Sequence, residues 1–246
     1  MSASIRFFVL GSVPKSFVDR VLGFLRDFLD KTSGEVYLEI YFYGTSREKL
    51  LHLESEAVEL GVLAVGDFIT MHEAWRGWPR IHVDYEKCRD LEDRYLRALV
   101  IHEACHAILH GSLEYYMISL DLRELSDLGF DEALKLSYLA STIIKDLDVI
   151  EYLLARDMRE IVDHYTDFLF ERNTDLDCES REDVFQLAKI LIPCVYRENC
   201  PIERLSPGCQ KHSKRVIEIL RSFRAKRSRD LSIDTLDLVK ILVRTL

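Results

Sequence analysis

The chain has 246 residues, of which 48% are hydrophobic and 30% are charged, and its formal net charge is −9. A chain of this length can bury one large core, or an ordinary core with a helical extension. The negative balance argues against nucleic acid as a partner, because such binding depends on neutralising phosphates with Lys and Arg. The N-terminal apolar run, residues 5–10, is far too short for an export signal or a membrane span. We therefore expect a cytoplasmic globular protein without a membrane partner.

Side-chain usage is typical of a thermophile protein. Charged residues are abundant, and only four amide side chains occur: Asn173, Gln186, Asn199 and Gln210. Asn and Gln are thermolabile, whereas networks of ion pairs stabilise proteins at high temperature. Four of the six cysteines gather near the C-terminus: Cys178, Cys194, Cys200 and Cys209. Because they include no Cys-x-x-Cys pair, disulfides or buried thiols are favoured over a second zinc site that would use Cys209 and His212.

Strand and helix patterns alternate over the first hundred residues. The predicted strands are residues 5–10, 35–43 and 80–85, with a further extended stretch at 61–70. The predicted helices are residues 14–29, 45–61 and 91–109. The second of these helices has the clearest ends, because Thr45 and Glu48 match a capping box and Gly61 is a natural C-terminal stop.

Only helical patterns remain after Gly111. Gly129 is a break in the pattern, and Asp131 is the expected N-cap of a long helix that ends near Met158. The later predicted helices are residues 159–170, 180–195, 213–225 and 233–245, with a loop at 200–209. The polar, acidic stretch 173–182 predicts a boundary between a domain of residues 1–172 and a helical subdomain of residues 173–246. The expected fold class is therefore α+β, with a small sheet and an active-site helix followed by an all-helical C-terminal region.

The strongest chemical signal is the segment His102-Glu103-Ala104-Cys105-His106, inside the helix predicted at 91–109. Residues four apart lie on one face of a helix, so the two imidazoles can bind a single ion. Glu103 can take a proton from a metal-bound water, whose pKa zinc lowers towards neutrality. The motif therefore predicts a Zn²⁺ site with His102 and His106 as ligands and Glu103 as general base. The alternative interpretation is a solvated polar helix face, or histidines hydrogen-bonded in a core.

A catalytic zinc also needs a third protein ligand and an open position for water. The best source of a third ligand is the helix predicted at 131–158, where Asp146 and Glu151 flank the apolar face. We favour Asp146 and keep Glu151 as the alternative. His110 continues the histidine stripe by one turn, but a straight helix diverges from the ion over two turns. His110 is therefore expected to contact one of the metal-binding side chains or to fill space in the core. Direct binding of the metal by His110 is the less favoured interpretation.

The ten residues from His102 to Gly111, HEACHAILHG, resemble the active-site helix of small zincin-type HExxH metallopeptidases, namely the minigluzincins and the ImmA/IrrE-like peptidases. The signature of the latter also runs on to a histidine four residues past the motif. The resemblance covers about residues 35–158 and is sharp only over the ten-residue motif. It implies a small twisted sheet, a downstream helix with an acidic third ligand, and an edge strand, here residues 80–85, that binds peptide by strand addition.

The resemblance also implies roles for single residues. Many zincins use a glutamate as third ligand, which matches Glu151. Other HExxH proteins carry an Asp-x-x-Val pattern, which Asp146 to Val149 matches. Zincins often stabilise the oxyanion with a Tyr or His, and the candidates are Tyr115, Tyr116, His164 and Tyr165, although each is more often ordinary packing.

The sequence thus predicts a zinc-dependent hydrolase, and the resemblance narrows it to a metallopeptidase with a peptide or protein substrate. Two alternatives stay open: a hydrolase of a non-peptide substrate, and a non-catalytic zincin-fold regulatory or binding protein with a structural metal. A closed site with His110 as fourth ligand would favour the latter. The basic cluster in residues 211–229 could contact nucleic acid or an acidic partner, although a solvated face of an amphipathic helix is the commoner explanation. The sequence makes no prediction of the oligomeric state.

Overall fold

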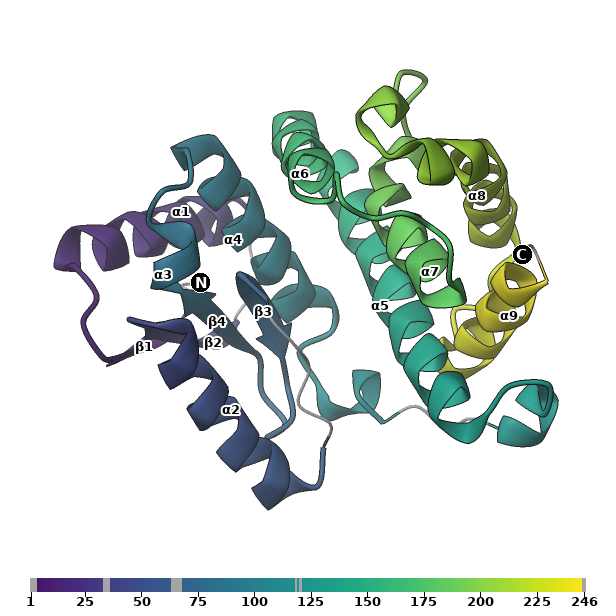
Figure 1. The fold of residues 1–246 in the computed structure, drawn as a ribbon. Helices are drawn as coiled ribbons and strands as arrows, with labels where there is room; N and C mark the ends of the chain where they lie inside the picture. The colour runs from purple at the N-terminus through teal and green to yellow at the C-terminus, as the bar shows by residue number, and fades with distance from the viewer. Residues whose placement is uncertain (1–3, 33–35, 63–67, 118, 120, 245–246) are drawn as a thin grey trace. The chain divides into compact units, whose positions relative to one another are not determined.

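The computed structural model describes residues 4–32, 36–62, 68–117, 119 and 121–244 (Figure 1). The chain divides into two compact units, Met1–Met117 and Ile118–Leu246. The first unit holds a four-stranded mixed sheet with helices, and the described part of the second is helical, so the predicted α+β class is confirmed. The domain boundary predicted after residue 172 lies inside the second unit, between α6 (Arg159–Arg172) and α7 (Arg181–Ile190). Among the described residues, no helix has the length and apolar character needed to cross a membrane.

The sheet of the first unit has the strand order β1-β2-β4-β3. Its strands are β1 (Ser4–Leu10), β2 (Tyr37–Tyr43), β3 (Thr70–Glu73) and β4 (Arg80–Asp84). The first three in spatial order are parallel, and β3 runs antiparallel to β4. β4 is therefore an interior strand, which makes the expectation that residues 80–85 form the edge strand wrong. All five of its residues are buried, as expected for a strand with neighbours on both sides.

The edge strand beside β4 is β3, which the sequence analysis did not predict as a strand of its own. Only Thr70 belonged to the extended stretch expected at 61–70, and residues 63–67 of that stretch lie outside the described residues. β3 has four residues, too few to show a clear period in the sequence. Its pairing with β4, rather than its own composition, makes it a strand.

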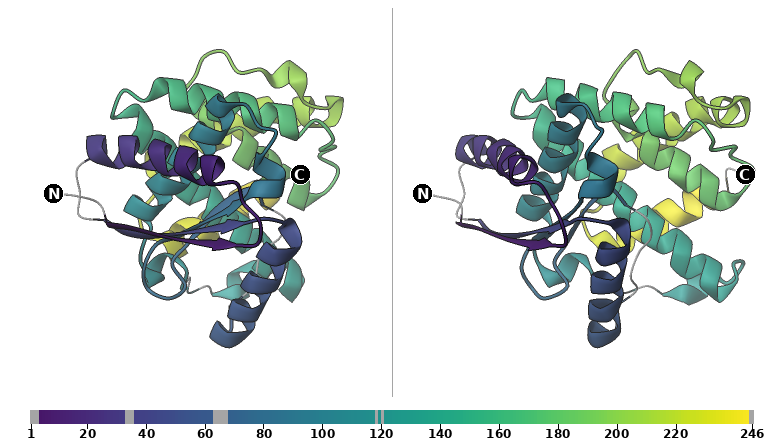
Figure 2. Two further views of the ribbon diagram at one scale, coloured as in Figure 1. Left: turned by 90° about the vertical axis from the view of Figure 1, so that its left-hand side faces the viewer. Right: turned by 60° about the vertical axis from the view of Figure 1, so that its left-hand side comes forward.

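The pairing register separates the side chains of the sheet into two faces, because residues opposite each other on neighbouring strands share a side. One face carries two cross-strand rows: Phe42–Val83–Thr70 and Ile40–Ile81–His72. Helices α1 (Lys15–Thr32) and α4 (Asp93–Leu109) pack on this face, whereas α2 (Ser46–Leu60) lies on the other side of the sheet (Figure 2). The covered face is apolar except at the edge strand, where Thr70 and His72 point towards α4.

The opposite face of the sheet carries a buried polar network under α2. Arg80, only 1% exposed, forms ion pairs with Glu56 of α2 and Glu73 of β3. Nε2 of His82 lies 3.0 Å from Glu73, and its Nδ1 lies 2.8 Å from the hydroxyl of Tyr43. Burial raises the pKa of Glu56, but the hydrogen bonds and charge of Arg80 outweigh it and lower the value to about 2. The network therefore fixes β3 to β4 and α2 to the sheet.

The ends of α2 follow the predicted signals. The side chain of Thr45 accepts a hydrogen bond from the Glu48 backbone, and the Glu48 carboxylate accepts one from the Thr45 backbone. Gly61 ends the helix in the left-handed conformation, with φ of 66°. Both the capping box and the glycine stop are confirmed. A short helix that was not predicted, α3 (Tyr85–Cys88), follows β4 and is capped by Asp84.

The second unit is built around α5 (Phe130–Leu154), a helix of 25 residues (Figure 1). Helices α6, α7 and α9 (Leu231–Val243) pack against α5, and α8 (Pro207–Lys226) packs on α7 and α9. The first residue of α5 is Phe130 and its N-cap is Gly129, whereas Asp131 was the predicted N-cap.

Two later helix boundaries differ from the predictions, and proline explains both. α7 ends at Ile190, before the predicted end at Val195, because Pro193 cannot continue the helical hydrogen bonds and Ile192–Val195 form a 3-10 turn. α8 begins at Pro207, inside the predicted loop, because proline suits the first helical position and the Ser206 side chain caps the helix.

Two disulfides cross-link the second unit, Cys178–Cys209 and Cys194–Cys200. Cys209 is therefore a disulfide partner and offers no thiolate, which contradicts the alternative of a second zinc at Cys209 and His212.

Candidate metal centre

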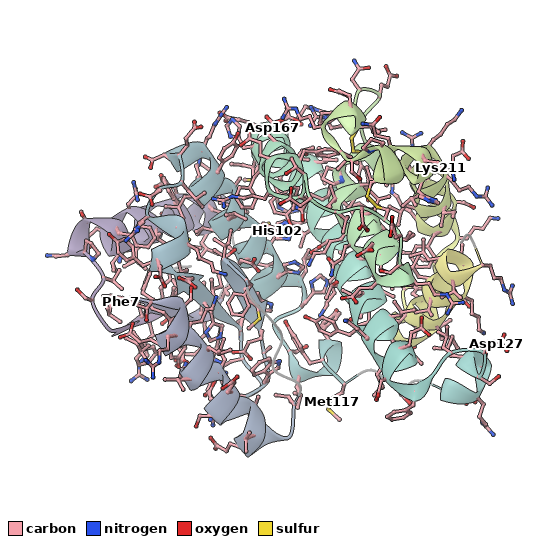
Figure 3. All side chains as sticks on the ribbon, in the orientation of Figure 1. Phe7, His102, Met117, Asp127, Asp167 and Lys211 are labelled. Carbon is pink, nitrogen blue, oxygen red and sulfur yellow. A yellow bond between two sulfur atoms is a disulfide. The ribbon has the colours of Figure 1, made fainter. Side chains whose placement is uncertain are left out.

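The two histidines and the glutamate of the motif lie on α4, in the first unit; His102 is labelled in Figure 3. Every residue of α4 from 98 to 107 is buried. His102, Glu103 and His106 are 3%, 8% and 9% exposed, so they do not form a solvated polar face. Polar groups buried to this degree need partners or a ligand. The motif is therefore an inward-facing polar cluster on an otherwise apolar helix segment.

His102 and His106 point the same ring nitrogen at each other. Their Nε2 atoms are 3.1 Å apart, in line with the four-residue spacing of the motif. Two nitrogens bound to one tetrahedral zinc at about 2.0–2.1 Å each would be separated by about 3.3 Å. The observed separation fits joint ligation of a single ion, so the residues present suit a metal site.

His110 follows α4 as its C-cap, one turn past His106. Its Nδ1 lies 3.1 Å from Nδ1 of His106, which is the ring nitrogen remote from the one that faces His102. The ring of Tyr115 meets His110 edge-on, with centroids 4.9 Å apart. A partner at the remote nitrogen fixes the tautomer and orientation of a metal-binding imidazole. His110 is thus placed to orient His106 rather than to bind the same ion.

Glu103 is held from the edge strand of the sheet. Its Oε1 accepts a hydrogen bond of 3.0 Å from Oγ1 of Thr70, the first residue of β3. Both side chains are buried. The bond restricts the rotation of the carboxylate next to the histidine pair, which is the position that a general base requires.

A second contact from β3 reaches the histidine pair through His72. Its ring stacks on His106, with centroids 6.0 Å apart and planes within 8° of parallel. The hydroxyl of Tyr116 lies 2.8 Å from Nδ1 of His72. Tyr116, one of the predicted oxyanion candidates, therefore belongs to this cluster, as Tyr115 does through His110.

Thr70 and His72 were not among the site residues predicted from the sequence. Once β3 is known to be a strand, its period of two places both polar side chains on one face, but a four-residue segment gives no such signal in the sequence by itself. The remaining oxyanion candidates, His164 and Tyr165, lie on α6 in the second unit.

The predicted third ligand, Asp146, lies on α5 in the second unit and is 3% exposed. Nζ of Lys189 is 3.5 Å from its Oδ2. Burial lowers the pKa of the adjacent Lys145 to about 8, and the negative charge of Asp146 opposes this shift. The carboxylate thus lies in a buried, positively charged part of α5 and α7.

Glu151, the alternative ligand, is engaged elsewhere in the second unit. Its Oε1 accepts hydrogen bonds from Arg224 at 2.5 Å and from the Tyr196 hydroxyl at 3.1 Å, and its Oε2 accepts one from Arg227 at 3.2 Å. Burial and the charge of Glu151 raise the pKa of Tyr196, which keeps its hydroxyl a donor. Any metal would have to compete with two arginines for this carboxylate, which favours Asp146.

His102 and His106 offer two imidazole donors in the first unit, and Asp146 is a buried carboxylate in the second. The chain matches no family model, no curated protein and no solved structure. An assignment of function must therefore come from the chemistry of these residues.

Proposed function

We propose that the protein is a zinc-dependent hydrolase, and specifically a metallopeptidase, in which His102 and His106 bind the metal and Glu103 is the general base. The observation that carries the proposal is the 3.1 Å separation of the two Nε2 atoms beside an oriented carboxylate on one buried helix. Zinc, when bound, would supply a Lewis acid and a water of lowered pKa.

Glu103 would perform the proton transfers of the reaction. It would accept a proton from the attacking water and deliver it to the leaving amine of the cleaved peptide bond. The hydrogen bond from Thr70 supports this role, because a donor at Oε1 holds the carboxylate in one orientation. A glutamate that served only the fold would not need to lie between two candidate metal ligands.

The position of His110 supports a catalytic rather than a structural metal. A structural zinc site closes its coordination with four protein ligands, whereas a catalytic site keeps one position for water. His110 contacts the remote nitrogen of His106 and so does not compete for that position. This argues against the alternative in which His110 completes a closed site.

A peptide substrate is favoured over other carbonyl compounds by the strand next to the motif. β3 is an edge strand, and edge strands can pair with an extended peptide through backbone hydrogen bonds. The same strand carries Thr70 and His72, which contact Glu103 and His106. A peptide aligned on β3 would therefore be aligned by the element that also orients the general base.

Asp146 is the proposed third ligand. It is a buried carboxylate, and carboxylate oxygen together with imidazole nitrogen is a common donor set for catalytic zinc. The ion pairs of Glu151 with Arg224 and Arg227 leave it less suited to the role.

The zinc content of the purified chain tests the metal site. Elemental analysis should find about one zinc per chain in the wild type, and a strong loss in His106→Ala and in Asp146→Ala. Glu151→Ala is the matched control and should retain zinc. Loss of zinc in Glu151→Ala with retention in Asp146→Ala would exchange the two roles. A wild-type chain without zinc, even after reconstitution, would contradict the proposal.

Peptide hydrolysis tests the chemistry separately from the metal. A library of quenched fluorescent peptides should reveal a cleaved sequence in the wild type, and Glu103→Gln should bind zinc normally while losing at least about a thousandfold in kcat. Zinc retention with no cleavage of any peptide or protein tested would instead support the non-catalytic alternative.

A further inference from the structure

A groove in the second unit is separate from every residue of the proposed active site. It lies between α8 and α9 and has a volume of about 500 Å³. Its floor is apolar and consists of Ile219, Phe223 and Ile241. Ile219 and Phe223 are 7% and 5% exposed, whereas Ile241 is 39% exposed and is the part of the floor that a ligand can contact.

The basic residues near the groove fall into two groups. Arg221 donates to backbone carbonyls of residues 194, 195 and 197, while Arg224 and Arg227 form ion pairs with acidic residues of α5. These three arginines hold α8 in place. Arg227 and Lys240 also line the groove, but both are engaged in ion pairs, Lys240 with Glu124. The second group lines the groove and is exposed: Arg215, Lys226 and Arg244. Within the described ranges, no member of the second group forms an ion pair.

We propose that the groove binds an acidic, amphipathic peptide segment of another protein. An apolar side chain of the segment contacts the floor, and its carboxylates pair with the three exposed cations. The charge complementarity is local, because the chain as a whole carries a net charge of −9, whereas the lining of the groove has five basic residues and two acidic ones. Helices that dock in grooves use this combination of apolar anchors and flanking charges.

The same residues disfavour a nucleic acid as the occupant. Glu218 and Asp237 also line the groove, and their charges would repel evenly spaced phosphates. Phe223 is 5% exposed, so its ring face is not available for stacking on a base. A peptide can place its carboxylates at the cations and leave the two acidic residues facing solvent or a neutral side chain.

Fluorescence anisotropy of the full-length chain with labelled probes tests the proposal. The probe is a synthetic helical peptide of about twelve residues, with leucines at i, i+3 and i+7 and glutamates between them. Three reference probes are a peptide with lysines in place of the glutamates, a peptide with serines in place of the leucines, and a single-stranded oligonucleotide of matched charge. Only the acidic, leucine-containing peptide should bind saturably, with an affinity that falls as salt is added.

Charge-reversal variants assign the binding to the groove. Arg215→Glu combined with Lys226→Glu should weaken the acidic peptide at least about tenfold, and Arg244→Glu should weaken it independently. Lys214→Glu is the matched control, because Lys214 is exposed on the same helix but does not line the groove. It should change the affinity less than about twofold. Ile241→Ser should weaken binding, and Ile233→Ser, exposed on the same helix outside the groove, should not.

Three results would overturn the proposal: no saturable binding of the acidic peptide, an equal loss in Lys214→Glu, or oligonucleotide binding that depends on Arg215 and Lys226 while the peptide does not bind. Circular dichroism of each variant verifies folding. The substituted cations are exposed and without described ion pairs, so their replacement should leave the melting temperature unchanged.

Discussion

Oγ1 of Thr70 lies 3.0 Å from Oε1 of Glu103, and this hydrogen bond joins edge strand β3 to the helix that carries the motif. The pairing of Thr70 with Val83 places the threonine on the sheet face that α4 covers. The orientation of the proposed general base therefore depends on the register of a four-residue strand. A shift of one residue would turn Thr70 to the opposite face.

Thr70→Val removes the hydroxyl while nearly preserving the shape of the side chain. We expect kcat of peptide hydrolysis to fall about tenfold to a hundredfold, because the carboxylate loses its orienting donor, while zinc content stays unchanged. Thr70→Ser keeps the donor and should recover most of the activity. Steady-state kinetics and elemental analysis measure both quantities. Equal kinetics of Thr70→Val and wild type would mean that the bond serves only the fold.

Glu151→Gln tests whether Glu151 stabilises the fold while Asp146, on the same helix, binds the metal. The change removes the charge that pairs with Arg224 and Arg227, of which Arg227 is largely buried. We expect the free energy of unfolding to fall by about 1–2 kcal/mol, because the pair is partly screened by solvent. Urea unfolding measures the effect, and zinc content should not change. Loss of zinc without loss of stability would reverse the assignment of Asp146 and Glu151.

Local signals predicted the helices of the chain well, and the pairing of strands was beyond their reach. The capping box at Thr45 and the stop at Gly61 act within a few residues, so they could be recognised in the sequence. The order of the sheet depends on long-range pairing, so local signals missed β3, and the edge position of residues 80–85 was expected only from the family resemblance. A proline can precede or follow a helix. The sequence alone therefore did not show that α7 ends before Pro193 and that α8 begins at Pro207.

Some parts of the candidate site could be predicted from local sequence signals, and others could not. The histidine pair follows from helical periodicity alone, since residues four apart must share a face. The contacts of Thr70 and His72 depend on strand register and could not be derived from the motif. The cysteine pairs likewise join positions 31 and 6 residues apart, and their spacing alone did not identify the partners.

Arg80→Met tests the polar network under α2. The substitution removes the buried cation that Glu56 and Glu73 share, so among the described ion-pair partners Glu56 keeps only the partly exposed Arg76 and Glu73 keeps only His82. Breaking a buried ion pair typically costs about 3–5 kcal/mol. Arg89→Met is the control, because Arg89 pairs with Asp90 at the exposed surface and should cost less than about 0.5 kcal/mol. Denaturant titrations compare the two variants. Similar losses in both would show that the network contributes no more than a surface pair.

The pKa of Glu56 predicts a loss of stability in acid. The folded value is about 2 and the ordinary value is 4.5, so the folded state binds the proton less tightly than the unfolded state. The stabilisation is complete above pH 4.5 and is lost as the pH falls towards 2. Urea unfolding at pH 7, 4 and 3 should show a decrease that is smaller in Glu56→Gln. A variant with the same pH dependence as wild type would show that Glu56 has no part in acid unfolding.

The two disulfides should contribute unequally to the stability of the second unit. Cys178–Cys209 spans 31 residues and Cys194–Cys200 spans 6, and a longer loop loses more conformational entropy when it is closed in the unfolded chain. On this basis the first disulfide is worth about 4 kcal/mol and the second about 2 kcal/mol. Cys178→Ser with Cys209→Ser should therefore lower the melting temperature more than Cys194→Ser with Cys200→Ser, as measured by calorimetry.

Titration with a thiol reagent under denaturing conditions should find two thiols in the wild type, from Cys88 and Cys105. Six thiols in the unreduced protein would contradict both pairings.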